Sequence, residues 1–441
     1  MYFDKNFTFG VATSSYQIEG AHNEDGRTPS IWDTFSRIEG KVLNMDNGDV
    51  ACDHYHRYKE DVAIIKELGV DSYRLSVAWP RIFPEQGKYN PKGMEFYKNV
   101  LTELKRNGIK TAVTLYHWDL PQWLQDMGGW EIRQSTDLFL EYVQKCFEEL
   151  DALTDMWITH NEPWCASILS NAIGEHAPGK KDISAAIRVA HHLLLSHGKA
   201  VRLYHELGYK KPIGITLNLT PCYAASNSFS DRLAASNQDG TFNRWFLEPL
   251  FKGCYPLDIV NLYASRNSDF TFIHEGDFEV IGAQCDFLGV NYYNRSLMRY
   301  DSMSIALGSG AYSNYPKTDM GWEICPDEFV DLIQMLRDKY TDLPIYITEN
   351  GSAWVDKVEN GRVHDEGRTD FLVKHLEAVS KMNEMNLNVA GYYCWSLMDN
   401  FEWGHGYKQR FGIVYVDFET QERIKKDSYY KYQEIISQRN K

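Results

Sequence analysis

Several patterns that announce a metal, a nucleotide or a disulfide scaffold are missing from this sequence. It contains no C-x-x-C pair and no H-E-x-x-H run, so the common zinc patterns do not occur. The eight cysteines lie far apart, which favours reduced, buried thiols over a disulfide framework. The first apparent strand is not followed by G-x-G-x-x-G, the dinucleotide signature. We therefore expect no cofactor and no metal.

Long hydrophobic runs and a positive net charge are also lacking. No apolar stretch approaches the roughly 20 residues that span a bilayer. Lysine and arginine number 46 against 61 acidic residues, a net charge of −15, which argues against nucleic acid as a partner. The run Met1–Lys5 has no basic segment leading into an apolar one, so no signal peptide is expected. These features predict a cytoplasmic protein without a membrane partner; whether it forms a homo-oligomer stays open.

Aromatic residues are abundant, at 14% of the chain, with 12 tryptophans and 28 tyrosines. Such residues can simply fill a core. They can also stack on the apolar face of a pyranose ring. Composition alone leaves both interpretations open.

Short β-branched or aromatic runs alternate with amphipathic helical stretches, a rhythm that predicts βα units and a parallel sheet. One helical stripe runs from Leu138 through Tyr142 to Leu150, and another joins Phe329, Ile333 and Leu336. Eight segments are strand candidates: Phe7–Ala12, Asp71–Val77, Thr111–Tyr116, Met156–Thr159, Ile213–Leu217, Phe287–Val290, Ile345–Thr348 and Val389–Cys394.

Eight βα units predict an α/β fold of the (β/α)8 TIM-barrel type. The alternative is a doubly wound open sheet, which usually carries the glycine-rich turn that is absent here. Ser226–Gly240 and Tyr300–Met320 are expected to be long loops around the mouth of a site.

Polar and aromatic side chains follow almost every predicted strand, and the carboxyl ends of barrel strands form the face where active sites lie. Two of these side chains are carboxylates, Glu162 after the fourth strand and Glu349 after the seventh. Either alone could be an ordinary surface or salt-bridged group. Two at matching strand ends fit glycoside hydrolysis, which needs a pair of carboxylates around the scissile bond.

Four runs, in order, make the sequence resemble glycoside hydrolase family 1, the β-glucosidase family. They are Phe7–Ala21 (FTFGVATSSYQIEGA), Thr159–Pro163 (THNEP), Ile347–Gly351 (ITENG) and Trp395–Trp403 (WSLMDNFEW). The resemblance covers essentially the whole chain and implies one barrel domain over residues 1–441 with elaborated βα loops. It also implies a retaining β-glucosidase that acts on short β-glucosides or oligosaccharides, with side activity on β-galactosides or β-fucosides.

The resemblance further implies a role for each matching residue. Glu349 would be the nucleophile and Glu162 the acid/base. Nucleophile support would come from Arg74, Asn291 and Tyr293. The glycone would be bound by Gln17, His117, Trp118, Asn161, Trp395, Glu402 and Trp403, with hydrogen bonds to hydroxyls from all of them except Trp395, the stacking floor. Trp322 would be an aglycone platform, although a loop-packing aromatic is an equally good interpretation.

One position departs from the family motif as we read it. His160 stands beside the expected acid/base, where an apolar residue is more common, and alternation along a strand predicts that it points away from Glu162. Two histidine sets lie on apparent helices away from the strand ends, and their spacing does not predict a metal site. They are His191, His192 and His197, and Asp53, His54 and His56.

Three alternatives to β-glucosidase remain open on the residues. A 6-phospho-β-glycosidase of the same family would need to bind phosphate, and Lys408 and Arg410 lie near the expected sugar site. A non-catalytic sugar-binding protein is disfavoured because both carboxylates are present. A transglycosylase would use the same covalent intermediate.

Overall fold

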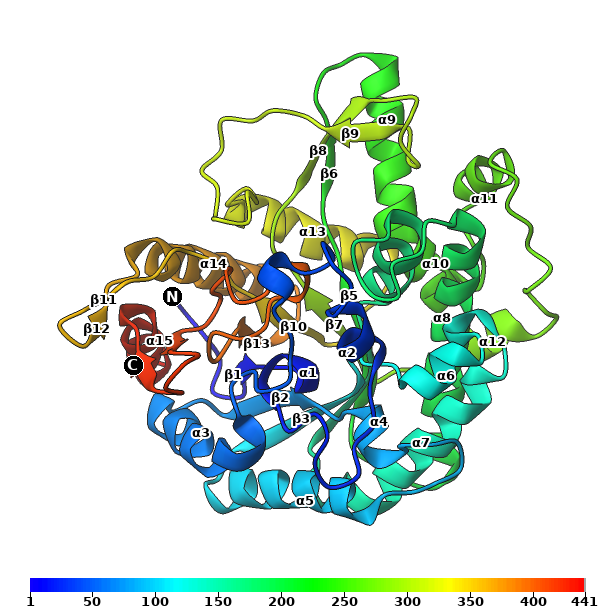
Figure 1. The fold of residues 1–441 in the computed structure, drawn as a ribbon. Coiled ribbons are helices and arrows are strands. Elements are labelled where there is room, and N and C mark those ends of the chain that lie inside the picture. Colours follow the sequence, from blue (N-terminus) through cyan, green and yellow to red (C-terminus); the bar gives the residue numbers. More distant parts are fainter. Residues whose placement is uncertain (440–441) are drawn as a thin grey trace.

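A computed structural model of the chain describes residues 1–439. Eight parallel strands close into a barrel surrounded by helices (Figure 1), so the predicted (β/α)8 fold is confirmed and the open sheet is excluded. Around the barrel the strands follow chain order: β1 (Thr8–Ala12), β2 (Ser72–Ser76), β3 (Lys110–Tyr116), β4 (Met156–Asn161), β5 (Ile213–Asn218), β7 (Phe287–Asn291), β10 (Ile345–Asn350) and β13 (Val389–Trp395). Each predicted strand is present, with ends that differ by one or two residues.

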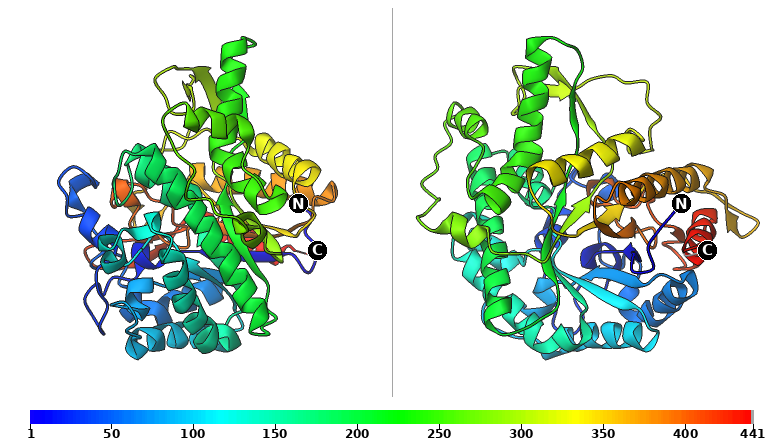
Figure 2. Two further views of the ribbon diagram at one scale, coloured as in Figure 1. Left: turned by 90° about the vertical axis from the view of Figure 1, so that its right-hand side faces the viewer. Right: turned by 180° about the vertical axis from the view of Figure 1, so that it is seen from behind.

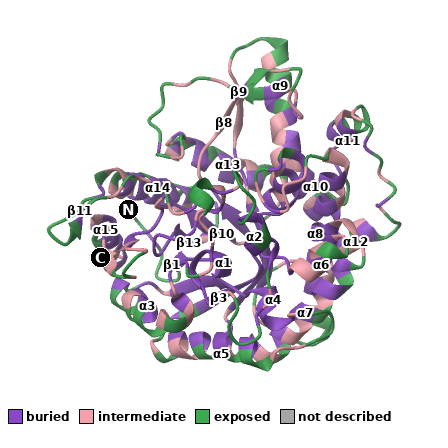
Figure 3. Cartoon of the chain, in the orientation of Figure 1, coloured by how far each residue is buried: buried purple, intermediate pink, exposed green. Residues whose placement is uncertain are grey.

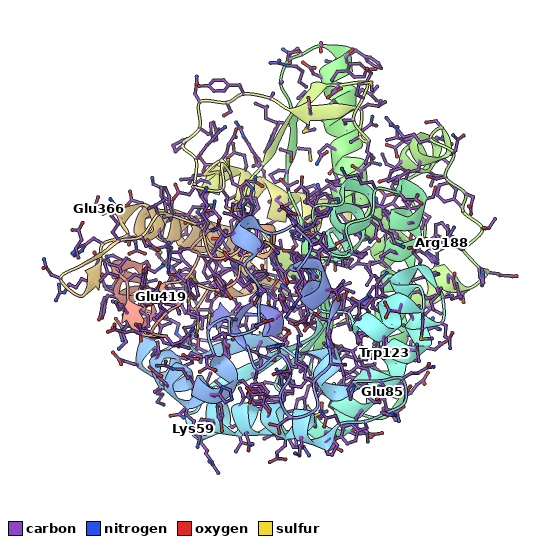
Figure 4. All side chains as sticks on the ribbon, viewed as in Figure 1. Lys59, Glu85, Trp123, Arg188, Glu366 and Glu419 are labelled. Carbon is purple, nitrogen blue, oxygen red and sulfur yellow. The ribbon has the colours of Figure 1, made fainter. Side chains whose placement is uncertain are left out.

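The long helices form the outer wall. They are α3 (His54–Leu68), α5 (Pro91–Arg106), α7 (Ser135–Leu150), α8 (Ile183–Glu206), α13 (Pro326–Lys339), α14 (Glu366–Glu384) and α15 (Asp427–Ser437). Their apolar stripes face the strands, and Phe139, Tyr142 and Phe147 of α7 are fully buried, as the spacing predicts. Figure 3 shows buried strands at the centre and exposed residues on the outer helix faces. In Figure 4, Lys59 of α3 and Glu366 of α14 lie at this periphery.

Shorter elements connect the barrel units. The helices are α1 (Ser15–Ile18), α2 (Ile31–Phe35), α4 (Trp79–Ile82), α6 (Gln122–Asp126), α9 (Phe229–Asp239), α10 (Trp245–Lys252), α11 (Leu257–Ala264) and α12 (Asp277–Ile281). The added strands are β6 (Cys222–Ala224), β8 (Ser296–Tyr300), β9 (Gly308–Gly310), β11 (Val358–Glu359), β12 (Arg362–Val363), β14 (Val414–Val416) and β15 (Arg423–Lys425). Two π-helical segments, Cys165–Ile173 and Gly240–Arg244, complete the connections after β4 and α9.

The prediction of a loop over Ser226–Gly240 is wrong, because most of this segment is helix α9. Ser228 caps the helix by accepting a hydrogen bond from the backbone N–H of Asp231 at 3.1 Å. The helix packs on β6 and β8, and together they project beyond the barrel (Figures 1 and 2). The other expected loop, Tyr300–Met320, is irregular apart from the short strand β9 and the end of β8.

The two ends of the chain help to close the barrel's outer wall. The Tyr2 backbone N–H donates to Ser380 Oγ of α14 at 2.7 Å. Arg439 pairs with Asp71, just before β2. Both ends therefore lie on the same side of the molecule (Figure 1). Within residues 1–439, no helix has the length and apolarity needed to cross a membrane.

Candidate active site

A cavity of about 420 Å³ opens at the carboxyl ends of the barrel strands. The barrel brings most of the predicted site residues into its wall: His117, Trp118, Glu162, Asn291, Tyr293, Trp322, Glu349, Trp395, Glu402 and Trp403. Arg74 and Asn161 lie behind that wall and hold its side chains. A concave, aromatic-walled cavity with a few polar groups is the usual form of a small-molecule site.

Glu349 is the next-to-last residue of β10 and is only 3% exposed. Its two oxygens have separate partners, since Arg74 Nη1 donates to Oε1 at 2.7 Å and the Tyr293 hydroxyl donates to Oε2 at 2.7 Å. Arg74 stands on β2, across the barrel, and is itself buried. A cation and a hydroxyl on one carboxylate favour its ionised form.

Glu162 lies directly after β4 and is 5% exposed. Asn291 Nδ2 donates to its Oε1 at 2.6 Å, and Cys165 Sγ donates to its Oε2 at 3.1 Å. Neither partner carries a charge. The backbone φ of Glu162 is +49°, a region that a residue with a Cβ rarely adopts and that occurs often at functional sites.

Asn161 connects the two carboxylates. Its Oδ1 accepts hydrogen bonds from Arg74 Nη2 at 2.6 Å and from Asn291 Nδ2 at 3.0 Å. Its own amide therefore points the other way, and Nδ2 donates to His117 Nε2 at 3.2 Å. Burial, and then the charge of Arg74, hold the pKa of His117 well below its usual range. His117 is thus neutral with its proton on Nδ1.

The unequal neighbours separate the two carboxyl groups electrostatically. Burial, and then the charge of Glu349, raise the pKa of Glu162 to about 8. Burial also raises the pKa of Glu349, but the charge of Arg74 and the hydrogen bond from Tyr293 oppose that rise. A proton shared by this pair is therefore held mainly by Glu162, the arrangement of an acid beside an ionised carboxylate.

Glu402 presents a third carboxyl group to the cavity. Burial, followed by the charges of Glu349 and Glu162, raises its pKa to about 8. Its Oε2 is buried and has no hydrogen-bond partner among residues 1–439. A buried polar atom without a partner is costly, and a ligand hydroxyl in the cavity would satisfy it.

Three flat rings form one side of the cavity. His117 lies nearly parallel to Trp395, at 5.8 Å between centroids, and to Trp403, at 6.0 Å. All three are buried. A flat, apolar face of this kind suits the CH face of a pyranose.

Two of the residues expected to bind the sugar have hydrogen-bond partners within the protein. Trp118 lines the cavity, but its indole N–H donates to the Asn161 carbonyl at 2.9 Å, so this N–H is not available to a sugar hydroxyl as expected. Gln17 is fully buried, and its amide nitrogen donates to Asn400 Oδ1 and the Phe401 carbonyl. A hydrogen bond from Gln17 to a sugar stays a prediction.

Trp322 lies on the loop before α13 and lines the outer cavity. It packs against Tyr293 at 5.2 Å and Phe411 at 6.0 Å between centroids. The structure thus supports both earlier interpretations, because the ring packs on its loop and also faces the cavity. The platform role stays a prediction.

Histidines outside the cavity have structural partners. His160 points away from Glu162, as predicted: its Nε2 bonds Ser196 at 2.8 Å and its ring stacks on Phe139. His191 bonds Asp277, and His192 bonds the Trp130 carbonyl. In the part of the chain that the structure describes, no cluster of three His, Cys, Asp or Glu residues is arranged to hold a metal.

Lys408 and Arg410, the two cations that kept a phosphorylated substrate open, do not line the cavity. Arg410 Nη1 donates to Asp399 at 2.6 Å and to the Val416 carbonyl at 2.9 Å. Lys408 is exposed. Among the described residues, the cavity wall contains the acidic side chain of Glu402 and no lysine or arginine.

Cys165, which bonds Glu162 directly, was not among the predicted site residues. A signal was present: a residue three positions after Glu162, at the start of a helical segment, returns to the same side of the chain. Trp164 and Phe242, whose rings pack at 4.3 Å in the outer wall, were not predicted either. Phe242 follows a segment predicted to be a loop, so no periodicity marked it.

A barrel with two buried, differently supported carboxyl groups at its carboxyl-end face defines a glycoside-hydrolase type of site. The model of glycosyl hydrolase family 1 matches residues 1–441. The chain belongs to this family.

Several known members are similar over nearly their whole length. "Beta-glucosidase A" of Acetivibrio thermocellus is 47% identical over 439 residues, which are 98% of each chain. The crystal structure of the family 1 β-glucosidase from Exiguobacterium antarcticum is 58% identical, covers 99% of this chain and 98% of that one, and superposes with a TM-score of 0.98. A "6-phospho-beta-galactosidase" of Clostridium acetobutylicum is 37% identical over 98% of this chain and 96% of the relative, so family membership alone does not define the substrate.

Proposed function

We propose that this chain is a retaining β-glucosidase that releases terminal β-D-glucosyl residues from cellobiose, short cello-oligosaccharides and aryl glucosides. The observation that carries the proposal is the unequal support of the two carboxyl groups. Arg74 and Tyr293 favour an ionised Glu349, whereas burial and the nearby charge favour a protonated Glu162. A carboxylate and a carboxylic acid facing one cavity are the two groups that retaining hydrolysis needs.

In the first step, ionised Glu349 attacks the anomeric carbon. Glu162 protonates the glycosidic oxygen as the bond to it breaks, and the aglycone leaves. In the second step, Glu162, now a carboxylate, takes a proton from water as the water attacks the glycosyl ester. Glu349 departs ionised, and the sugar is released with its original configuration.

The remaining cavity residues would recognise the glycone. Neutral His117 can donate from Nδ1 to a hydroxyl, and the ring of Trp395, nearly parallel to that of His117, offers a stacking face. Asn161 has its Oδ1 committed to Arg74 and Asn291, so its expected contact with the 2-hydroxyl must use the remaining amide hydrogen. Glu402 would accept from the 4- and 6-hydroxyls with the oxygen that lacks a protein partner.

A panel of 4-nitrophenyl glycosides tests this assignment. We expect the β-glucoside to be hydrolysed fastest, with slower cleavage of the β-fucoside and β-galactoside. The galactoside is inverted at C4 and the fucoside also lacks the 6-hydroxyl, so both would lose contacts with Glu402 and its neighbours. The 6-phospho-β-glucoside should not be hydrolysed, because its charge of about −1.5 to −2 would meet the acidic Glu402 and no lysine or arginine in the described cavity wall. Preference for that phosphorylated substrate would overturn the proposal.

We also propose a cytoplasmic location, supported by eight free cysteines, five of them buried. Cell fractionation tests it: activity in a culture supernatant from intact cells would contradict it. Whether the chain forms a homo-oligomer is a separate question, which light scattering of the purified protein answers.

A further inference from the structure

The carboxyl group of Glu162 has two chemically different neighbours. Asn291 Nδ2 lies 2.6 Å from Oε1, and Cys165 Sγ lies 3.1 Å from Oε2. An amide N–H can only donate a hydrogen bond. A thiol is a weak donor and also a weak acceptor. The two oxygens of this carboxyl group are therefore not equivalent.

The chain places the thiol there by local geometry. Cys165 begins the helical segment that follows Glu162, and its backbone N–H donates to the Glu162 carbonyl at 2.9 Å. Asn218, at the end of β5, approaches the sulfur with Nδ2 at 3.6 Å. Because this amide hydrogen points at the sulfur, the S–H bond is free to point toward Glu162 Oε2 whenever that oxygen carries no proton. Both Cys165 and Asn218 face the substrate cavity.

We propose that Cys165 is a positioning residue for the proton that Glu162 transfers. The amide of Asn291 occupies Oε1, so the acid proton sits on Oε2, where the sulfur accepts it weakly. When the proton passes from Oε2 to the glycosidic oxygen, the electron pair of the breaking C–O bond goes to that oxygen. Oε2 is then anionic, and the S–H group donates to it. This inference rests on the proposed role of Glu162.

A thiol suits both halves of this cycle. As an acceptor it is too weak to hold the proton against a sugar oxygen. As a donor it gains strength once the carboxylate is charged, since hydrogen bonds to ionised groups are stronger. The net effect is to stabilise the carboxylate more than the acid, and the hydrogen bond from Cys165 accordingly lowers the pKa of Glu162 against the rise caused by burial.

The test compares Cys165→Ala with Cys165→Ser through the pH profile of kcat/KM. Alanine removes the donor, so the pKa of Glu162 should rise and the alkaline limb should move to higher pH by about half a unit. Serine keeps a donor, so its limb should lie below that of the alanine variant. Cys146→Ala is the matched control, because Cys146 is a fully buried thiol on α7, outside the cavity wall; its limb should coincide with that of the wild type.

The proposal would be overturned if the alkaline limb of Cys165→Ala lies at the same pH as that of the wild type or at a lower pH. It would also be overturned if the limb of Cys165→Ser does not lie at a lower pH than that of Cys165→Ala. An equal shift in Cys146→Ala would overturn it too, because the effect would then come from packing. Failure of the underlying function is a distinct outcome: Glu162→Ala would then cleave alkyl glucosides at the wild-type rate.

A reciprocal measurement does not depend on the cysteine variants folding. Burial, and then the charge of Glu162, raise the pKa of the Cys165 thiol well above its usual range. Glu162→Gln removes that charge, so iodoacetamide at about pH 9.5, where Glu162 is ionised in the wild type, should label Cys165 several-fold faster in the variant, as read by peptide mass spectrometry. Labelling of the exposed Cys254 should be unchanged. Equal labelling of Cys165 in both proteins would contradict the coupling.

Discussion

Arg74 and Glu349 form a buried ion pair across the barrel, with 2.7 Å between Nη1 and Oε1. The same guanidinium holds Asn161, which in turn bonds Asn291 and His117. One cation on β2 therefore stabilises the charge on one carboxylate and orients the amides beside the other. Removing a partner from such a pair leaves an unpaired buried charge, which is strongly unfavourable.

The pH profile of kcat/KM should be bell-shaped with an optimum roughly between pH 5 and 7. Glu162 must be protonated to act as the acid. Its folded pKa is raised, to about 8, so activity is present below that value and is lost as pH rises through it. Glu349 must be ionised, so protonation at low pH gives the acidic limb. Initial rates between pH 4 and 10 check this, and a rate that rises steadily to pH 9 would exclude Glu162 as the acid.

Glu162→Ala should slow substrates according to how much their leaving group needs a proton. Alkyl glucosides and cellobiose should lose about 10²–10⁴-fold in the glycosylation step. Nitrophenyl glucosides should lose far less, because nitrophenolate departs without protonation. Comparing kcat/KM across leaving groups of graded basicity measures this, and a uniform loss for all of them would point to misfolding or to a different role.

Glu402→Ser should weaken hydrolysis of unphosphorylated β-glucosides by about 2–4 kcal/mol of transition-state binding, or roughly 30- to 1,000-fold in kcat/KM. Two sugar hydroxyls lose their hydrogen-bonding carboxyl group in this variant. Substrates without the 6-hydroxyl should lose less. If β-glucosides and β-xylosides lose equal factors, Glu402 does not read the 6-position.

Lys426 joins the carboxyl-terminal segment to the loops around the site. It is fully buried and bonds Asp399 at 2.7 Å and also Asp356. Asp399 Oδ1 also accepts from the Gly412 backbone N–H at 3.0 Å, beside cavity residue Phe411.

Lys426→Ala should therefore lower the free energy of unfolding by about 3–5 kcal/mol, because two buried carboxylates lose a partner. The adjacent Lys425→Ala breaks only a partly exposed pair with Glu67 and should cost under ~1 kcal/mol. Urea unfolding followed by tryptophan fluorescence compares the two variants, and equal losses would contradict this account of the network.

The sequence predicted the barrel well because each of its eight strands is a short, buried, β-branched or aromatic run followed by a polar group. It failed at α9, where the run from Ser226 to Gly240 is rich in serine, asparagine and aspartate. That helix is stabilised by its Ser228 cap and by packing on β6 and β8. Such tertiary contacts leave little periodicity in the sequence.

Within the site, residue identity predicted which side chains meet but not which atoms remain available. The motifs brought Trp118 into the cavity wall, yet its N–H is bonded to Asn161. Cys165 carries no motif of its own, and its importance follows from one sulfur–oxygen distance. Hydrogen-bond partners depend on the relative placement of strands far apart in sequence, which one-dimensional patterns do not encode.

The central claim is that Glu349 is the nucleophile of a double displacement. The most direct test is Glu349→Gly assayed on 2,4-dinitrophenyl β-glucoside with and without azide, with the product anomer read by NMR. The account predicts negligible turnover without azide, recovery that rises with azide concentration, and an α-glucosyl azide, since azide would take the place of the missing carboxylate. Wild-type activity without azide, or a β-glucosyl azide, would contradict it.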